Sequence, residues 1–138
     1  MIEGFVNVDN IINTVNFYNS KNFGLRHTFT NNLINSTDLN DTVANIICRI
    51  SEKPINGITC NSDLLKNYIE NNYPNFYFLY STTLNLSNIN KINELSKNNI
   101  VILNYNFNNN FEKLTLLKYP QNIEILIGES CIDNCPDR

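Results

Sequence analysis

The sequence predicts an α/β fold built on a parallel sheet of five or six strands joined by crossover helices. Short apolar runs alternate five times with segments of helical apolar spacing. The centres of successive runs lie roughly 20 to 30 residues apart, a spacing too long for hairpins and sufficient for crossover helices. The runs are continuously apolar, as expected for strands buried on both faces. We therefore expect a partial (β/α) barrel, with an open doubly wound sheet as the alternative.

Capping residues and helix breakers divide the chain into its expected elements. A first helix ends near Gly24, and Pro54 stops the second, which has the cleanest amphipathic pattern. The expected N-caps are Asp9, then Thr37 or Asp38, then the run Asn61-Ser62-Asp63, and then Ser87. The expected strands are residues 25–29, 57–60, 76–80, 100–103 and 123–127, and the segment 1–8 is a further expected strand.

The length of the chain predicts one α/β domain over residues 1–127, followed by a cysteine-containing C-terminal loop or tail over 128–138. At 138 residues the chain can bury a core. It is too short for a complete eight-fold barrel, which needs about 250 residues. About thirty asparagines fall mostly on polar positions of the periodic segments, so we expect them to form polar surface.

Charge and hydropathy exclude two classes of partner from our expectations. The formal net charge is -3, and no segment gathers Lys and Arg into a basic patch, so nucleic acid is not an expected partner. The apolar runs are far shorter than the roughly 18 residues of a membrane span. The first residues also lack the pattern of a signal peptide. We expect a cytoplasmic protein with no membrane partner.

The expected binding site lies at the carboxyl ends of the strands, where parallel α/β sheets hold their ligands. The residues that follow the strands form a polar rim with almost no charge, suited to a small polar molecule. The ligand-binding candidates are Thr30, Asn31, Asn61, Ser62, Ser81, Thr82, Asn104 and Asn106.

Two residues are candidates for catalysis, although the reaction stays unknown. His27 is the only histidine, the side chain whose unperturbed pKa lies near neutrality, so it is a candidate base, with a hydrogen-bonded structural histidine as the alternative. Glu129 is the carboxylate at a strand end with an apolar approach, and a solvated loop acid is its alternative. No nucleotide-binding or serine-hydrolase motif is present.

The four cysteines fall into two groups. Cys48 and Cys60 lie inside periodic apolar segments and are expected to be buried, reduced thiols. Cys131 and Cys135 are candidate ligands for zinc or an iron-sulfur cluster, but such sites need about four protein ligands. Within the chain only Cys60 and His27 remain to complete the set. Two free loop thiols are therefore the expected state of the tail, and no cofactor is assigned.

A set of short motifs resembles an uncharacterised family found in anaerobic gut and rumen bacteria and their phages, which is distantly similar to TIM-barrel peptidase U32 and radical SAM proteins. The resemblance runs from about residue 10 to the end of the chain. It rests on the segments 17–19, 25–31, 61–65, 68–69, 73–74, 81–83 and 124–127, and on the final run from Cys131 to Arg138. The resemblance implies a TIM-barrel-type arrangement with the polar rim and the Cys pair on one side. The cysteine spacing of the tail differs from that of cluster-binding relatives, so neither activity is carried over.

Two functions follow from these observations. The first is a ligand-binding or enzyme-like partial barrel that uses the polar rim at its strand ends. The second is a non-catalytic structural or interaction protein, phage-encoded in origin, that assembles through its open sheet edges. Its expected partner is a second copy of the chain or another chain that covers the sheet edge.

Overall fold

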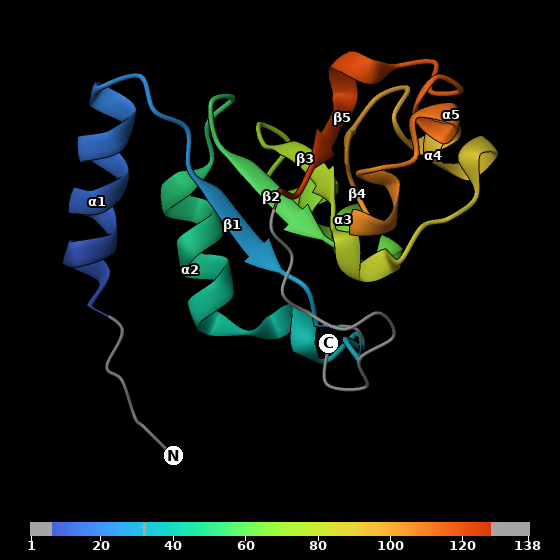
Figure 1. Ribbon diagram of the computed structural model, residues 1–138. Helices are drawn as coiled ribbons and strands as arrows, with labels where there is room; N and C mark the ends of the chain where they lie inside the picture. Colours follow the sequence, from blue (N-terminus) through green and yellow to red (C-terminus); the bar gives the residue numbers. More distant parts are fainter. Residues whose placement is uncertain (1–6, 32, 128–138) are drawn as a thin grey trace. The chain divides into compact units, whose positions relative to one another are not determined.

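The computed structural model describes residues 7–31 and 33–127 of the chain, and Figure 1 shows the elements in sequence colours. Helices and strands alternate along these residues, as the periodicity predicts. The main elements are α1 Val8–Ser20, β1 Arg26–Phe29, α2 Thr42–Ser51, β2 Gly57–Cys60, α3 Asp63–Asn72, β3 Tyr77–Tyr80, α4 Ile89–Leu95, β4 Ile100–Leu103, α5 Phe111–Leu114 and β5 Ile123–Ile125. The short 3-10 helices are η1 Asp38–Asn40, η2 Thr82–Leu84, η3 Tyr105–Phe107 and η4 Pro120–Asn122.

The five described strands form one sheet in the order β1-β2-β3-β4-β5, which is also their order along the chain. The pairs β1–β2, β3–β4 and β4–β5 are all parallel, with His27 opposite Ile58 and Leu79 opposite Ile100. The predicted α/β class with a parallel sheet is therefore confirmed. The order does not reverse among these strands, whereas a doubly wound sheet reverses at its switch point.

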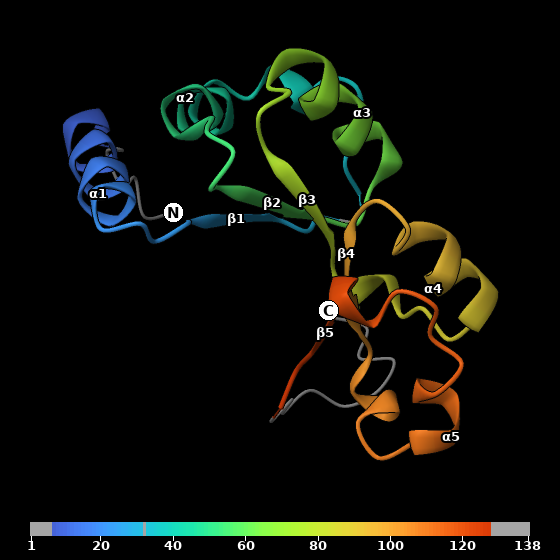
Figure 2. The same ribbon diagram turned by 90° about the horizontal axis from the view of Figure 1, so that it is seen from above.

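The chain divides into two compact units, residues 1–78 and 79–138, each with its own core. In the first unit α2 and α3 cover one face of β1 and β2 (Figure 2), and the core is built from side chains of α2, β2, α3 and β3. The second core lies between β3, α4, β4 and η3, with Leu103 and Ile92 fully buried. The predicted domain of residues 1–127 stays a prediction.

A buried asparagine ties together four segments of the first unit. Asn56 is 0% exposed, and its side chain exchanges two hydrogen bonds with the amide of Asn19, at 2.9 and 3.1 Å. Its Nδ2 also donates to the carbonyl of Ser51, and its Oδ1 accepts the backbone N–H of Leu25 at 2.8 Å. Because all four hydrogen-bonding positions of this amide are used, its burial carries no unsatisfied polar group.

Several helix starts differ from those the sequence predicts. The expected strand over residues 1–8 is wrong at Val8, which begins α1, while residues 1–6 lie outside the described residues. Ser62 caps α3 as expected. The observed caps of α1, α2 and α4 are Asn7 in place of Asp9, Asp41 in place of Thr37 or Asp38, and Asn88 in place of Ser87. Neighbouring polar residues have the same capping chemistry, so the sequence alone does not decide which of them takes the extended cap conformation.

Candidate functional site

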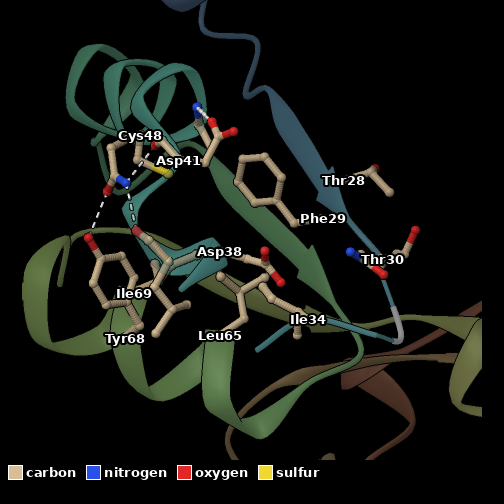
Figure 3. Close-up of a pocket in the computed structure, with 14 residues that line it drawn as sticks. Thr28, Phe29, Thr30, Ile34, Asp38, Asp41, Cys48, Leu65, Tyr68 and Ile69 are labelled. Atoms are coloured by element: carbon tan, nitrogen blue, oxygen red, sulfur yellow. Dashed lines mark hydrogen bonds between the residues drawn. The ribbon is translucent and has the colours of Figure 1, made fainter. Parts of the chain in front are cut away.

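A pocket of about 470 Å³ lies beside the carboxyl end of β1, within the first unit (Figure 3). Its walls come from the end of β1, the connection to α2, and the facing sides of α2 and α3. Phe29 points from β1 toward α2, whereas Thr28 points to the other side of the strand (Figure 3). The apolar part of the lining consists of Phe29, Ile34, Leu39, Ala44, Leu65 and Ile69.

The connection over residues 30–41 forms one wall of this pocket, and local hydrogen bonds hold its shape. The Asn31 side chain accepts the N–H of Leu33, and Asp38 Oδ2 accepts the N–H of Asn35, each at 2.9 Å. Asp41 then caps α2 by accepting the N–H of Ala44 at 2.7 Å. These are Asx-type bonds that fold the chain over short distances, so the connection is built without a further strand or long helix.

Asn45 joins the two helical walls of the pocket. Its Oδ1 accepts the hydroxyls of Tyr68 and Tyr73, both at 2.8 Å, which connects α2 to α3. Its Nδ2 donates to the carbonyls of Leu39 and Asp41, at 2.8 and 2.7 Å. Since every polar position of this amide is occupied, Asn45 holds the walls in place and has no donor or acceptor left for a ligand.

The structure brings together the sequence-predicted residues that follow β1 and β2. Asn61 Nδ2 donates to the carbonyl of Thr30 at 2.9 Å, so the two strand ends are joined. Thr30 and Asn31 line the pocket. Ser62 instead accepts the N–H of Leu65 at 3.4 Å and serves α3 as its N-cap.

The predicted rim residues of the second unit also lie together, but they close turns. Ser81 Oγ accepts the N–H of Thr83 at 3.2 Å and begins η2, and Thr82 is buried beside it. Asn104 Oδ1 accepts the N–H of Asn106 at 2.8 Å and begins η3. Asn104 Nδ2 donates to Asn85 Oδ1 at 2.5 Å, which links the connections after β3 and β4.

His27 lies in the middle of β1 and faces a different part of the first unit. Its ring packs edge-on against Phe76, with centroids 6.4 Å apart, and it lines a second pocket of about 380 Å³ together with residues of α1 and α2. The buried Nε2 has no hydrogen-bond partner among the described residues. Burial lowers the pKa of His27, which favours the neutral ring at pH 7. Its catalytic role stays a prediction, and the other candidate, Glu129, lies outside the described residues.

The two described cysteines are buried thiols. Cys48 lines the first pocket, and burial, with Glu52 adding to it, raises its pKa to about 11. Burial likewise raises the pKa of Cys60 to about 11. Both are therefore protonated at neutral pH and are poor nucleophiles. Cys131 and Cys135 lie outside the described residues, and within those residues no three His, Cys, Asp or Glu side chains cluster as metal ligands would.

Apart from Thr30 and Asn31, the lining residues of this pocket were not predicted as site residues, and the polar ones that were missed include Asp38, Asp41 and Tyr68. Asp38 was predicted only as a possible N-cap, Asp41 is the observed N-cap of α2, and Tyr68 lies on α3. A signal that could have pointed to the two acids is the length of the segment between β1 and α2, because long connections in compact domains often carry function.

Comparison of the chain with protein-family models, with curated proteins and with solved structures gives no match. The fold and the pocket are therefore the basis for any functional statement. In the described part of the chain, no helix combines the length and the apolar character needed to cross a bilayer.

Proposed function

We propose that this chain is a small-molecule-binding protein whose ligand occupies the pocket beside the carboxyl end of β1. The observation that carries the proposal is the position and make-up of the pocket. It lies where parallel α/β sheets hold ligands, and its volume of about 470 Å³ is in the range of ligand sites. Its lining combines an apolar majority with a few polar groups, which is the usual composition of such sites.

The walls of the pocket are preorganised, which supports binding as its role. Asn45 and Asp41 fix α2 against the connection and against α3 through hydrogen bonds of 2.7 to 2.8 Å. A site whose walls are already ordered loses little conformational entropy when a ligand enters. Cys48 and His27, whose pKa values burial raises and lowers respectively, line different pockets, so they do not form a nucleophile and base pair.

A fragment screen followed by amide chemical shifts tests the proposal. Fragments that bind should shift the resonances of Thr30, Asn31 and Cys48. Ala44→Leu should abolish these shifts, because Ala44 lines the pocket and a larger side chain fills it. Val43→Leu is the matched control, since the neighbouring Val43 is 39% exposed. Shifts that persist in Ala44→Leu, or that map to other parts of the unit, would contradict the proposal.

Exposed aromatic side chains favour a second candidate, an interaction protein that assembles beside β1. Phe17 and Phe23 are 60% and 64% exposed, and β1 is an end strand of the described sheet. An end strand with nearby exposed aromatic groups is a surface on which a second chain can add. Light scattering should then show a mass above that of one chain, reduced by Phe17→Ser and Phe23→Ser. A monomeric wild-type protein over the full concentration range rules this candidate out.

A further inference from the structure

We propose that the pocket beside β1 selects a small organic cation with an apolar body, such as a primary aralkyl amine. The proposal rests on the binding function inferred above and specifies the chemical class of the ligand. Two carboxylates, those of Asp38 and Asp41, are part of the lining. Among the described lining residues there is no Lys, Arg or His to balance them.

Both carboxylates keep an oxygen for a ligand. Asp38 uses Oδ2 to accept the N–H of Asn35 at 2.9 Å, and Asp41 uses Oδ1 to accept the N–H of Ala44 at 2.7 Å. These bonds fix the direction of each carboxylate, and Figure 3 shows the Asp38 carboxylate pointing toward β1. An ammonium group at the mouth of the pocket can donate to the second oxygen of either acid, and such charge-assisted hydrogen bonds are stronger than neutral ones.

The rest of the lining requires an apolar body on the same ligand. Phe29, Leu65 and Ile69 face the interior, and Cys48 presents a thiol that burial keeps protonated. A bare metal ion would leave this apolar surface uncovered and would have too few oxygen ligands, since Mg²⁺ and Ca²⁺ take six or more. An anionic ligand would meet two like charges. A cation that carries an aromatic or branched alkyl group matches both parts of the lining.

Three probes of similar size and different charge test the selectivity: 2-phenylethylammonium, 2-phenylethanol and 3-phenylpropanoate. Each is titrated into the whole chain while the amide shifts of Thr30, Asn31 and Cys48 are followed, at about 0.01 M and about 0.3 M NaCl. The ammonium probe should bind most tightly. Its affinity should fall at the higher salt concentration, whereas that of the alcohol should not, because only the cation depends on charge.

Charge-removing variants assign the effect to the two acids. Asp38→Asn and Asp41→Asn keep a side-chain acceptor for the backbone N–H, and Asn is as good an N-cap as Asp. Each variant should lower the affinity for 2-phenylethylammonium roughly two- to five-fold, the size expected for exposed ion pairs. The affinity for 2-phenylethanol should not change. Asp9→Asn in the first turn of α1 removes the same charge away from the pocket and should change neither affinity.

The outcomes separate the two proposals. One outcome is that 2-phenylethanol or 3-phenylpropanoate binds as tightly as 2-phenylethylammonium and that Ala44→Leu abolishes this binding. The cation selectivity is then overturned, while the proposed binding function stands. If cation binding is unchanged in both Asp→Asn variants, the selectivity is also overturned. If none of the three probes shifts the pocket amides at millimolar concentration, both the selectivity and the proposed pocket function fail.

Discussion

In both units an asparagine that follows a strand forms a hydrogen bond with the chain that leaves the neighbouring strand, but the structure that surrounds this bond differs. In the first unit, Asn61 follows β2 and donates to the carbonyl of Thr30, which follows β1. In the second unit, Asn104 follows β4 and donates to Asn85, in the connection that follows β3. In each case an asparagine placed directly after one strand fixes the chain that leaves the neighbouring strand.

The difference lies in what the chain does after the strand. In the first unit, residues 30–41 separate β1 from α2 and leave a pocket beside α2 and α3. In the second unit, η2 and η3 begin within two residues of their strands, so their polar side chains become caps and are buried. Polar residues after parallel strands therefore do not by themselves mark a binding site, because the same residue types also satisfy tight turns.

The largest expected effect comes from the buried amides that hold each unit together. Asn56→Ala removes four side-chain hydrogen bonds and leaves buried partners unsatisfied, so it should cost about 3 kcal/mol or more. Asn93→Ala, in the second unit, removes two such bonds and should cost about 1 to 2 kcal/mol. Urea unfolding measures both, with the exposed Asn67→Ala as a control near zero. A larger loss of unfolding free energy for Asn93→Ala than for Asn56→Ala would contradict this prediction.

A second experiment compares the two kinds of strand end directly. Asn104 is 4% exposed and begins η3, so Asn104→Ala should lower the free energy of unfolding by about 2 kcal/mol. Asn31 lies at the pocket and is exposed, and its side chain accepts a local hydrogen bond from the N–H of Leu33, so Asn31→Ala should lower the free energy of unfolding by no more than about 0.5 kcal/mol. If thermal or urea unfolding shows equal losses of free energy for Asn104→Ala and Asn31→Ala, the difference described between the strand ends of the two units is wrong.

The smallest expected effect is a pH dependence confined to the first unit. Because burial lowers the pKa of His27, the unfolded chain binds a proton more readily than the folded one near pH 6.5. The free energy of unfolding should therefore be highest above the pKa that His27 has in the unfolded chain, and it should decline as the pH falls from about 7.5 to about 5. His27→Gln should flatten this part of the profile, since the chain has one histidine. A wild-type profile that rises toward pH 5 would show the opposite shift.

Local sequence patterns predicted the strands well and the site only in part. Gly57–Cys60 and Ile100–Leu103 form strands with the predicted bounds, since continuous apolar runs between breakers have few alternatives. The prediction that asparagines form polar surface is wrong for Asn56 and Asn93, which are buried. The partners of Asn56 include Asn19, 37 residues away in sequence, and no local periodicity encodes such a bond.

The pocket escaped prediction for a similar physical reason. Its acids, Asp38 and Asp41, have a capping signature, and capping and ligand binding use the same carboxylate oxygens. Thr30 and Asn31 were found because they follow a strand directly. What could not be derived is that α3 packs beside this connection and α2, since this depends on contacts such as that between Asn45 and Tyr68, 23 residues apart in sequence.

The sequence Asn56-Gly57 has a further consequence for the first unit, because it affects the chemical stability of the Asn56 side chain. Asn56 is followed by Gly57, and in an unfolded chain the unhindered glycine nitrogen can attack the asparagine side-chain carbonyl, expel ammonia and form a succinimide that water opens to an acid. In the fold, that nitrogen donates to the carbonyl of Leu25 at 2.8 Å, and the side chain is held by its own four bonds. Deamidation would put a carboxylate where the side chain of Asn19 and the carbonyl of Ser51 require a donor, so the fold of each damaged molecule is destabilised. The fraction of molecules in which the first unit is open therefore determines how fast Asn56 is deamidated in a stored sample.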